Sequence, residues 1–139
     1  MRRANNKEQF TPFGIWLQEY CKQDLSITNL DFVIEDYKQK RVMLLEEKQN
    51  GGFIHHAQSL TFGVLDYALE IGAEQSGYTY WGFFLLAMPK GASMPGPGMT
   101  LNGHVITAEQ LQNHLNFTEK FCERMPLRHP RNIVVAAAA

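Results

Sequence analysis

The alternation of apolar and polar residues predicts a β-hairpin in the first half of the chain. Residues 31–37 form a run rich in β-branched and aromatic side chains, and residues 41–48 form a second apolar run of strand length. The polar residues 38–40 between them predict a tight turn, so the two strands should pair in antiparallel fashion. Because side chains alternate across a strand, Glu46 and Lys48 then share one face of the second strand.

Apolar residues that recur every three or four positions predict helices on either side of this hairpin. The first helix should begin after Thr11, an N-cap that precedes a proline, and the second should cover residues 56–71 and end at Gly72. We expect the first helix to turn an apolar stripe into the core that consists of Phe13, Trp16, Leu17 and Tyr20. On the second helix the apolar face consists of Leu60, Val64, Ala68 and Ile71.

The second half of the chain predicts one long buried strand followed by short elements. Residues 78–88 are apolar or aromatic almost throughout, which is typical of a strand covered on both faces in the middle of a sheet. Residues 89–100 contain three prolines and three glycines and predict a mobile surface loop. The pair Asn102-Gly103 then suits the positive backbone angles of a type I′ hairpin turn.

A third helix is predicted from Thr107, which forms a capping box with Gln110, to Pro126. With 139 residues the chain is expected to form a single domain, with its core at about residues 11–125 and a basic and alanine-rich tail at residues 126–139. The pattern of helices and strands therefore predicts an α/β domain with a mixed sheet flanked by helices.

The composition of the chain bears on whether the protein enters a membrane, where in the cell it is found and whether its cysteines form disulfides. The chain is 45% hydrophobic and 19% charged, and no apolar run approaches the roughly 20 residues that span a bilayer, so no membrane insertion is expected. Polar residues follow Arg2 and Arg3, so a secretory signal is not expected and we place the protein in the cytoplasm. Cys21 and Cys122 form no Cys-x-x-Cys pair and are expected to be reduced thiols in or near the core.

The charge balance permits nucleic acid as a partner without requiring it. The chain has 13 basic and 14 acidic residues and a formal net charge of −1, whereas phosphate contacts come from Lys and Arg. One bound divalent cation adds two positive charges and would make the total +1. The basic residues cluster, and candidate DNA contacts at the hairpin turn are Lys38, Lys40 and Arg41.

The charged residues at the hairpin ends are a candidate metal site. Asp31 opens the first strand and Glu46 lies near the end of its antiparallel partner, so their carboxylates should approach each other and bind Mg²⁺, with Mn²⁺ as a substitute. The backbone carbonyl of Glu47 and water would complete the shell. Lys48 shares the face of Glu46, where its ammonium would orient an attacking water and stabilise charge on a phosphate in the transition state.

With these residues the chain resembles the PD-(D/E)xK nuclease superfamily, which includes restriction enzymes, Holliday junction resolvases and phage-encoded nucleases. Asp31 matches the first acidic position, and residues 46–48 match the (D/E)xK tripeptide. The resemblance covers residues 11–88 in the order helix, hairpin, helix, strand, and it implies a restriction-endonuclease-like core. Leu30 replaces the proline that often precedes the aspartate, and Phe62 stands where RecB-like members carry tyrosine.

The resemblance also implies further roles. Glu19 of the first helix would join the metal shell, and Gln58 would lie near the site and support substrate or lysine placement. The implied activity is that of a metal-dependent DNA endonuclease from a small phage or mobile element, acting in the host cytoplasm. A domain of this size needs two copies to cut both strands of a duplex, so a homodimer or higher even oligomer is expected.

Other interpretations of the same residues remain open. A catalytically inactive nuclease-like domain that binds DNA or a protein partner has the same core, and a purely structural domain would use Asp31, Glu46 and Lys48 as a surface salt-bridge network. Gln58 would then be a helix cap. The tandem histidines at 55–56 lack matching ligand spacing for zinc and are interpreted as loop residues.

Overall fold

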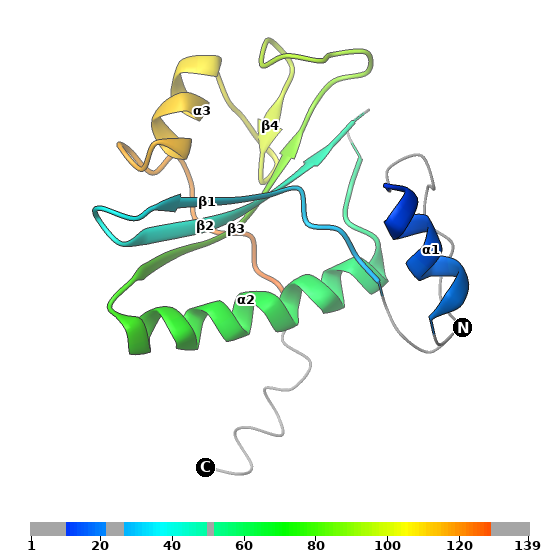
Figure 1. Ribbon diagram of the computed structural model, residues 1–139. Coiled ribbons are helices and arrows are strands. Elements are labelled where there is room, and N and C mark those ends of the chain that lie inside the picture. The colour runs from blue at the N-terminus through cyan, green and yellow to red at the C-terminus, as the bar shows by residue number, and fades with distance from the viewer. Residues whose placement is uncertain (1–10, 22–26, 50–51, 129–139) are drawn as a thin grey trace.

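The computed structural model describes residues 11–21, 27–49 and 52–128, and these residues form a mixed α/β fold (Figure 1). Their elements in chain order are α1 (Pro12–Tyr20), β1 (Phe32–Asp36), β2 (Arg41–Lys48), α2 (His56–Ser76), β3 (Thr79–Ala87), β4 (Thr100–Leu101), β5 (His104–Val105) and α3 (Ala108–Leu115). No helix in these ranges is long and apolar enough to cross a membrane.

The strands form one sheet in the order β1-β2-β3-β4-β5. β1 and β2 pair antiparallel, with Phe32 opposite Leu45 and Asp36 opposite Arg41, which confirms the predicted hairpin. β3 runs parallel to β2 in the middle of the sheet, because α2 carries the chain back between them, and β4 and β5 add a small antiparallel hairpin. The prediction of a mixed sheet with a central, largely buried β3 is therefore confirmed.

One helix lies on each face of the sheet (Figure 1). On the α3 side, alternate residues of the central strands pack with Leu111, and Met99 from the loop before β4 is fully buried there. The loop thus contributes to the core, which its prolines and glycines did not predict. On the α2 side, the opposite face of β2 and β3 packs against Phe62, whose ring lies 4.8 Å from that of Phe83.

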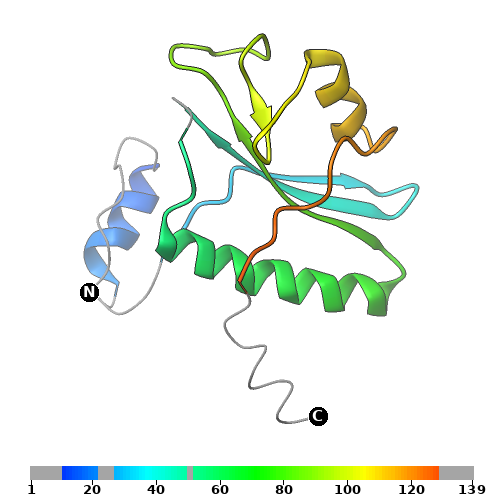
Figure 2. The same cartoon turned by 180° about the vertical axis from the view of Figure 1, so that it is seen from behind.

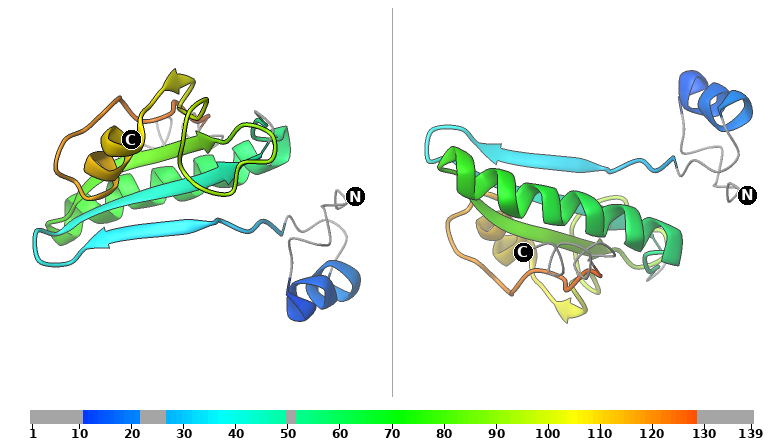
Figure 3. Two further views of the ribbon diagram at one scale, coloured as in Figure 1. Left: turned by 90° about the horizontal axis from the view of Figure 1, so that it is seen from above. Right: turned by 90° about the horizontal axis from the view of Figure 1, so that it is seen from below.

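The prediction that the aromatic stripe of the first helix enters the core is wrong. Phe13, Trp16 and Tyr20 are 65%, 51% and 68% exposed, and α1 has no buried residue. Its half-buried residues, Gly14, Ile15, Leu17, Gln18 and Cys21, include a set at helical spacing that faces away from the aromatic stripe. The physical reason is position: α1 lies beyond the start of β1 and not over the sheet, whose lower face is occupied by α2 (Figure 3).

The face assigned to the second helix also needs correction. Phe62, Asp66 and Ala73 are buried, whereas Val64 and Ile71 are each 43% exposed. Burial of the large Phe62 ring outweighs the aliphatic stripe and fixes the rotation of α2. The helix continues past Gly72 to Ser76, because its C-cap is Gly77, which adopts the left-handed conformation at φ 80°.

The third helix is shorter than predicted. It begins at Thr107, whose side chain accepts from the N–H of Gln110 as the capping box requires, but it ends at Leu115. Phe117 has φ 60°, outside the helical range, so the chain must leave the helix there. The following residues form an irregular segment in which half-buried Cys122, a free thiol like Cys21, still packs against the core.

The turn between the short strands β4 and β5 has the conformation that its sequence predicts. Asn102 and Gly103 have φ 50° and 84°, the two positive angles that a type I′ turn requires.

After α3, the chain runs across the sheet from the α3 side to α2 (Figure 2). There the N–H of Met125 donates to Phe83 O at 2.8 Å, beside the part of β3 that the short β4 does not cover. This C-terminal segment thereby covers an otherwise open strand edge.

Candidate active site

Four of the predicted site residues lie together where β1 begins, β2 ends and α2 begins. Asp31 directly precedes β1, and the antiparallel register that places Phe32 opposite Leu45 brings Asp31 beside Glu46. Lys48 is the last residue of β2 and shares the α2-facing side with Glu46. Gln58 lies in the first turn of α2. The hairpin and the crossover helix thus bring together residues that are up to 27 positions apart.

Each of the two carboxylates accepts a hydrogen bond from a backbone N–H on the opposite side of the hairpin. The N–H of Asp31 donates to Glu46 Oε1 at 3.1 Å, and the N–H of Glu47 donates to Asp31 Oδ2 at 2.8 Å. These reciprocal hydrogen bonds extend the β1–β2 pairing by one position and fix both carboxylates at the end of the hairpin. Glu46 is 3% exposed, while Asp31 is exposed to solvent.

Lys48 lies between the carboxylate pair and α2. Its Nζ is 3.3 Å from Glu46 Oε2 and donates to Gln58 Oε1 at 3.2 Å. The same oxygen of Gln58 accepts from the N–H of His55 at 3.3 Å, at the N-terminus of α2. Gln58 therefore caps the helix and holds the lysine at the same time, so the two interpretations of this residue are compatible.

Burial raises the pKa of the Glu46 carboxyl above its ordinary value, and the negative charge of Asp31 raises this pKa further. The hydrogen bond from the Asp31 N–H and the positive charge of Lys48 oppose the shift. A buried carboxylate next to a second carboxylate is destabilised as an anion, so the site gains from any added positive charge. Its electrostatics therefore favour a cation or a proton.

The donor set fits Mg²⁺ with few protein ligands. Mg²⁺ is commonly held by one or two carboxylates together with several waters or phosphate oxygens, which Asp31, Glu46 and the Glu47 carbonyl can supply. Within residues 11–21, 27–49 and 52–128, no three His, Cys, Asp or Glu side chains gather closely enough to hold a metal ion. Glu19, on α1, is accordingly not brought into a three-carboxylate shell with the pair.

The predicted DNA contacts lie at the other end of the hairpin. Lys38 and Lys40 belong to the turn between β1 and β2 and are exposed, some 20 Å from the carboxylates by the rise of a strand. Arg41 donates to Asp36 Oδ2 at 2.7 Å and to Phe117 O at 3.0 Å. The structure thus gives Arg41 a role in joining the hairpin to the chain after α3 and does not bring these three residues to the site.

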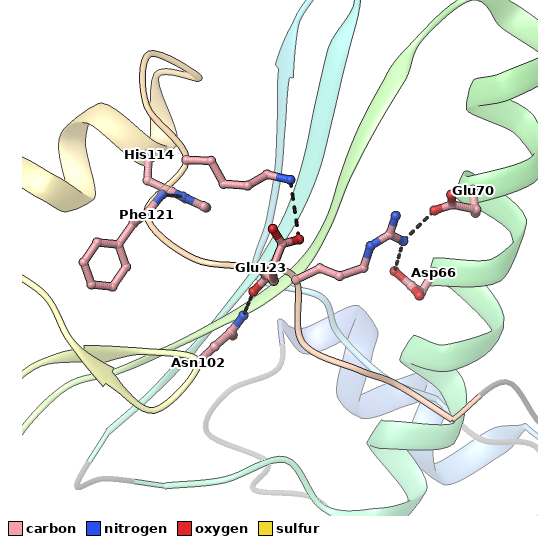
Figure 4. Close-up of polar contacts among 8 residues, drawn as sticks. Asp66, Glu70, Asn102, His114, Phe121 and Glu123 are labelled. Atoms are coloured by element: carbon pink, nitrogen blue, oxygen red, sulfur yellow. Dashed lines mark hydrogen bonds and ion pairs between the residues drawn. The ribbon is translucent and has the colours of Figure 1, made fainter.

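A second polar cluster was not predicted from the sequence. Tyr80 donates to Asp66 Oδ1 at 2.6 Å. Arg124 from the C-terminal segment pairs with Glu70 and lies 3.9 Å from Asp66, and Figure 4 draws these two contacts as dashed lines to Glu70 and Asp66. Gly82 has φ 116°, and a Cβ there would lie 2.3 Å from Arg124 Cβ. An aspartate on a helix opposite a tyrosine on a strand gives no sequence signal, because the pairing depends on the rotation of α2.

No protein-family model matches this chain, and no curated protein or solved structure matches it. The geometry of the two clusters is therefore the basis for assigning a function. The Asp66 cluster is internally paired and joins three segments, which suits a structural role. The Asp31 cluster combines an exposed carboxylate, a buried carboxylate and an ammonium at the end of a sheet, which suits phosphodiester chemistry.

Proposed function

We propose that this chain is a Mg²⁺-dependent DNA endonuclease with a PD-(D/E)xK site. The observation that supports the proposal is the convergence of Asp31, Glu46 and Lys48 at one end of the hairpin, with the buried Glu46 between the other two. The element order α1, β1, β2, α2, β3 is also the order proposed for a restriction-endonuclease-like core. In this proposal the protein acts on DNA in the cytoplasm, in the setting of a phage or mobile element.

Each residue of the cluster has a distinct role in the proposed reaction. Asp31 and Glu46 would hold the metal with the Glu47 carbonyl, and bound Mg²⁺ supplies charge neutralisation at the phosphate and an acidified water. Lys48 would orient the attacking water through its ammonium and stabilise the negative charge that develops on the phosphate. Gln58 is a positioning residue, because it contacts Lys48 and not the carboxylates.

A specific observation also favours a second candidate, a nuclease-like domain that binds DNA or a protein without cutting. Lys48 is already paired with Glu46, and Asp31 already accepts the Glu47 N–H, so both carboxylates already have partners within the chain. Such a network can stabilise the hairpin end with no catalytic role. The two candidates differ in cleavage, whereas a purely structural domain differs from the nuclease in showing no heat of Mn²⁺ binding by calorimetry.

The decisive experiment is a cleavage assay with plasmid, linear, branched and single-stranded DNA in Mg²⁺, Mn²⁺ or EDTA. We expect cleavage with either metal and none in EDTA. Lys48→Ala should lower the rate by about 10²–10³-fold, the usual effect of removing one charge-stabilising group. The matched control is Lys120→Ala, which removes a lysine of the segment after α3. Absence of cleavage by the wild type under every condition would favour the binding domain.

A further inference from the structure

The segment that connects β2 to α2 lies directly against the lysine of the candidate site. At its start, a Cβ at Gly52 would lie 3.3 Å from Lys48 Cβ, so the backbone packs against the stem of the lysine. At its end, the N–H of His55 donates to Gln58 Oε1, the atom that also accepts from Lys48 Nζ. Residues 52–55 are therefore held beside Lys48 at both ends.

Phe53 turns its ring outward from this segment. Its neighbour Ile54 packs against the core between the sheet and α2, and in an extended chain the residues on either side of Ile54 then point the opposite way. Phe53 is accordingly 73% exposed, and its ring meets that of His55 edge to face at 6.0 Å between centroids. This contact orients the Phe53 ring and leaves most of its surface open.

The residues around Phe53 carry no formal charge with which to repel or attract DNA. Residues 49–65 contain no Asp or Glu and no Lys or Arg, and the first turn of α2 holds no acidic residue. Without Lys or Arg, this segment cannot follow the phosphates of a duplex by ionic contacts. An exposed aromatic ring binds nucleic acid in a different way, by stacking on the face of a base.

Stacking on Phe53 requires a base whose face is free. In a continuous duplex the neighbouring bases cover both faces, so a side chain stacks only on a base that is unpaired, extruded or at an end. Phe53 follows Gly52 by one Cα–Cα step of about 3.8 Å, and Gly52 lies against Lys48. The ring is thus close enough to Lys48 for one nucleotide to contact both residues.

We propose that Phe53 stacks on an unpaired base of the substrate and makes the candidate site select DNA with such a base over continuous duplex. This inference rests on the proposed function for its substrate, DNA, and adds the residue that selects the strand. His55 is a positioning residue, because it contacts the Phe53 ring. Binding and cleavage are measured separately, so this inference and the proposed nuclease can fail separately.

The test is the binding of a labelled single-stranded oligonucleotide, measured by fluorescence anisotropy in EDTA and in Ca²⁺, a cation that takes carboxylate ligands. Phe53→Leu should raise the Kd about 5-fold to 150-fold, the effect of losing the stack on one base. Phe53→Trp keeps an aromatic ring and should bind at least as tightly as the wild type. The matched control is Tyr37→Leu, since Tyr37 is an aromatic residue that is 71% exposed at the other end of the hairpin.

A duplex of the same sequence, closed by a loop at both ends, should bind more weakly and equally to all four proteins. Circular dichroism should show that the variants keep the fold, because both changed side chains are exposed. An equal Kd of wild type and Phe53→Leu for the single strand would overturn the stacking role. So would a wild type that binds no single strand in either buffer, or an equal loss of binding in Tyr37→Leu.

Cleavage adds the outcomes that separate the two proposals. Weaker binding by Phe53→Leu together with no cleavage by the wild type under any condition would overturn the nuclease alone. Cleavage of the closed duplex as fast as of the single strand, unchanged in Phe53→Leu, would overturn the selection of unpaired bases and leave the nuclease.

Discussion

At the scale of single residues, Glu46 has the most unusual environment of the candidate site. Its carboxyl is almost fully buried, and the raised pKa means that the folded state binds this proton more tightly than the unfolded state does. The resulting stabilisation is present below the ordinary glutamate pKa of 4.5 and is lost as the pH rises through the raised value. At neutral pH and without a bound metal ion, an ionised Glu46 therefore lowers the free energy of unfolding.

Glu46→Gln should accordingly stabilise the protein in EDTA at pH 8 and change little at pH 4. The amide can still accept the Asp31 N–H but carries no charge, so the gain in Tm should grow with pH to a few degrees. Thermal unfolding followed by circular dichroism from pH 4 to 8 measures this. Glu109→Gln, at an exposed position of α3, is the control. An equal change at every pH would show that burial of charge is not the cause.

The sequence was sufficient to predict that these residues come together, because the relevant distances are set by local rules. Strand alternation places Glu46 and Lys48 on one face, and a tight hairpin brings Asp31 beside Glu46. The sequence could not predict that Lys48 would contact both Glu46 and Gln58, since that depends on where α2 starts in space. The role of Glu19 stays a prediction, because helical spacing fixes a residue's face but not the position of its helix.

At the scale of elements, the rotation of α2 depends on polar contacts that the spacing of its apolar residues does not predict. Asp66 is 2% exposed yet accepts the hydroxyl of Tyr80 and lies near Arg124. The pKa of the Tyr80 hydroxyl is raised, mainly by burial and then by its hydrogen bond to Asp66, so it remains a donor at neutral pH. A buried carboxylate with such partners is tolerated on the inner face of a helix.

Tyr80→Phe should therefore destabilise the fold by about 1–3 kcal/mol, because the buried Asp66 loses a hydrogen bond while the ring packing is kept. Urea unfolding measures the change. Tyr37→Phe is the matched control, since Tyr37 is 71% exposed in the hairpin turn. If the candidate site is catalytic, the rate of DNA cleavage should not change in either variant below the unfolding transition. Equal stability of the two variants would contradict a structural role for the Asp66 contact.

The elements themselves were largely predictable, whereas their rotation and ends were less so. The caps at Thr107 and Gln110 and the turn at Asn102 depend on neighbours in sequence, and these predictions are confirmed. The buried face of α2 depends on Phe62 meeting Phe83 from a distant strand, which the stripe of smaller aliphatic residues concealed. The early end of α3 follows from the backbone at Phe117, for which the apolar spacing gave no signal.

At the scale of the whole molecule, the C-terminal segment closes the sheet that the other elements leave open. Along β3, the short β4 pairs only with Leu86 and Ala87 at the end of the strand. The earlier part of that edge is contacted by the C-terminal segment, where Met125 donates to Phe83 O. Met125 and Leu127 also pack against the core on the α2 side. The predicted tail begins at residue 126, yet Leu127 packs against the core, so the described part of that tail belongs to the fold.

Truncation after Cys122 should consequently cost several kcal/mol, because it removes Arg124 and Met125 and exposes the edge of β3 together with apolar core residues. Truncation after Arg128 keeps all of these contacts and is the matched control. Chemical denaturation of both proteins gives the difference in the free energy of unfolding. Equal stability would mean that the sheet does not need the segment.

The position of Arg124 over Gly82 has a consequence for how this protein is made. About forty residues separate the glycine from the arginine that covers it. The ribosome must therefore add about forty residues after β3 before that strand can be closed, and the exit tunnel still hides the closing segment when the hairpin has already emerged. The half-covered sheet is the species that a chaperone would meet first.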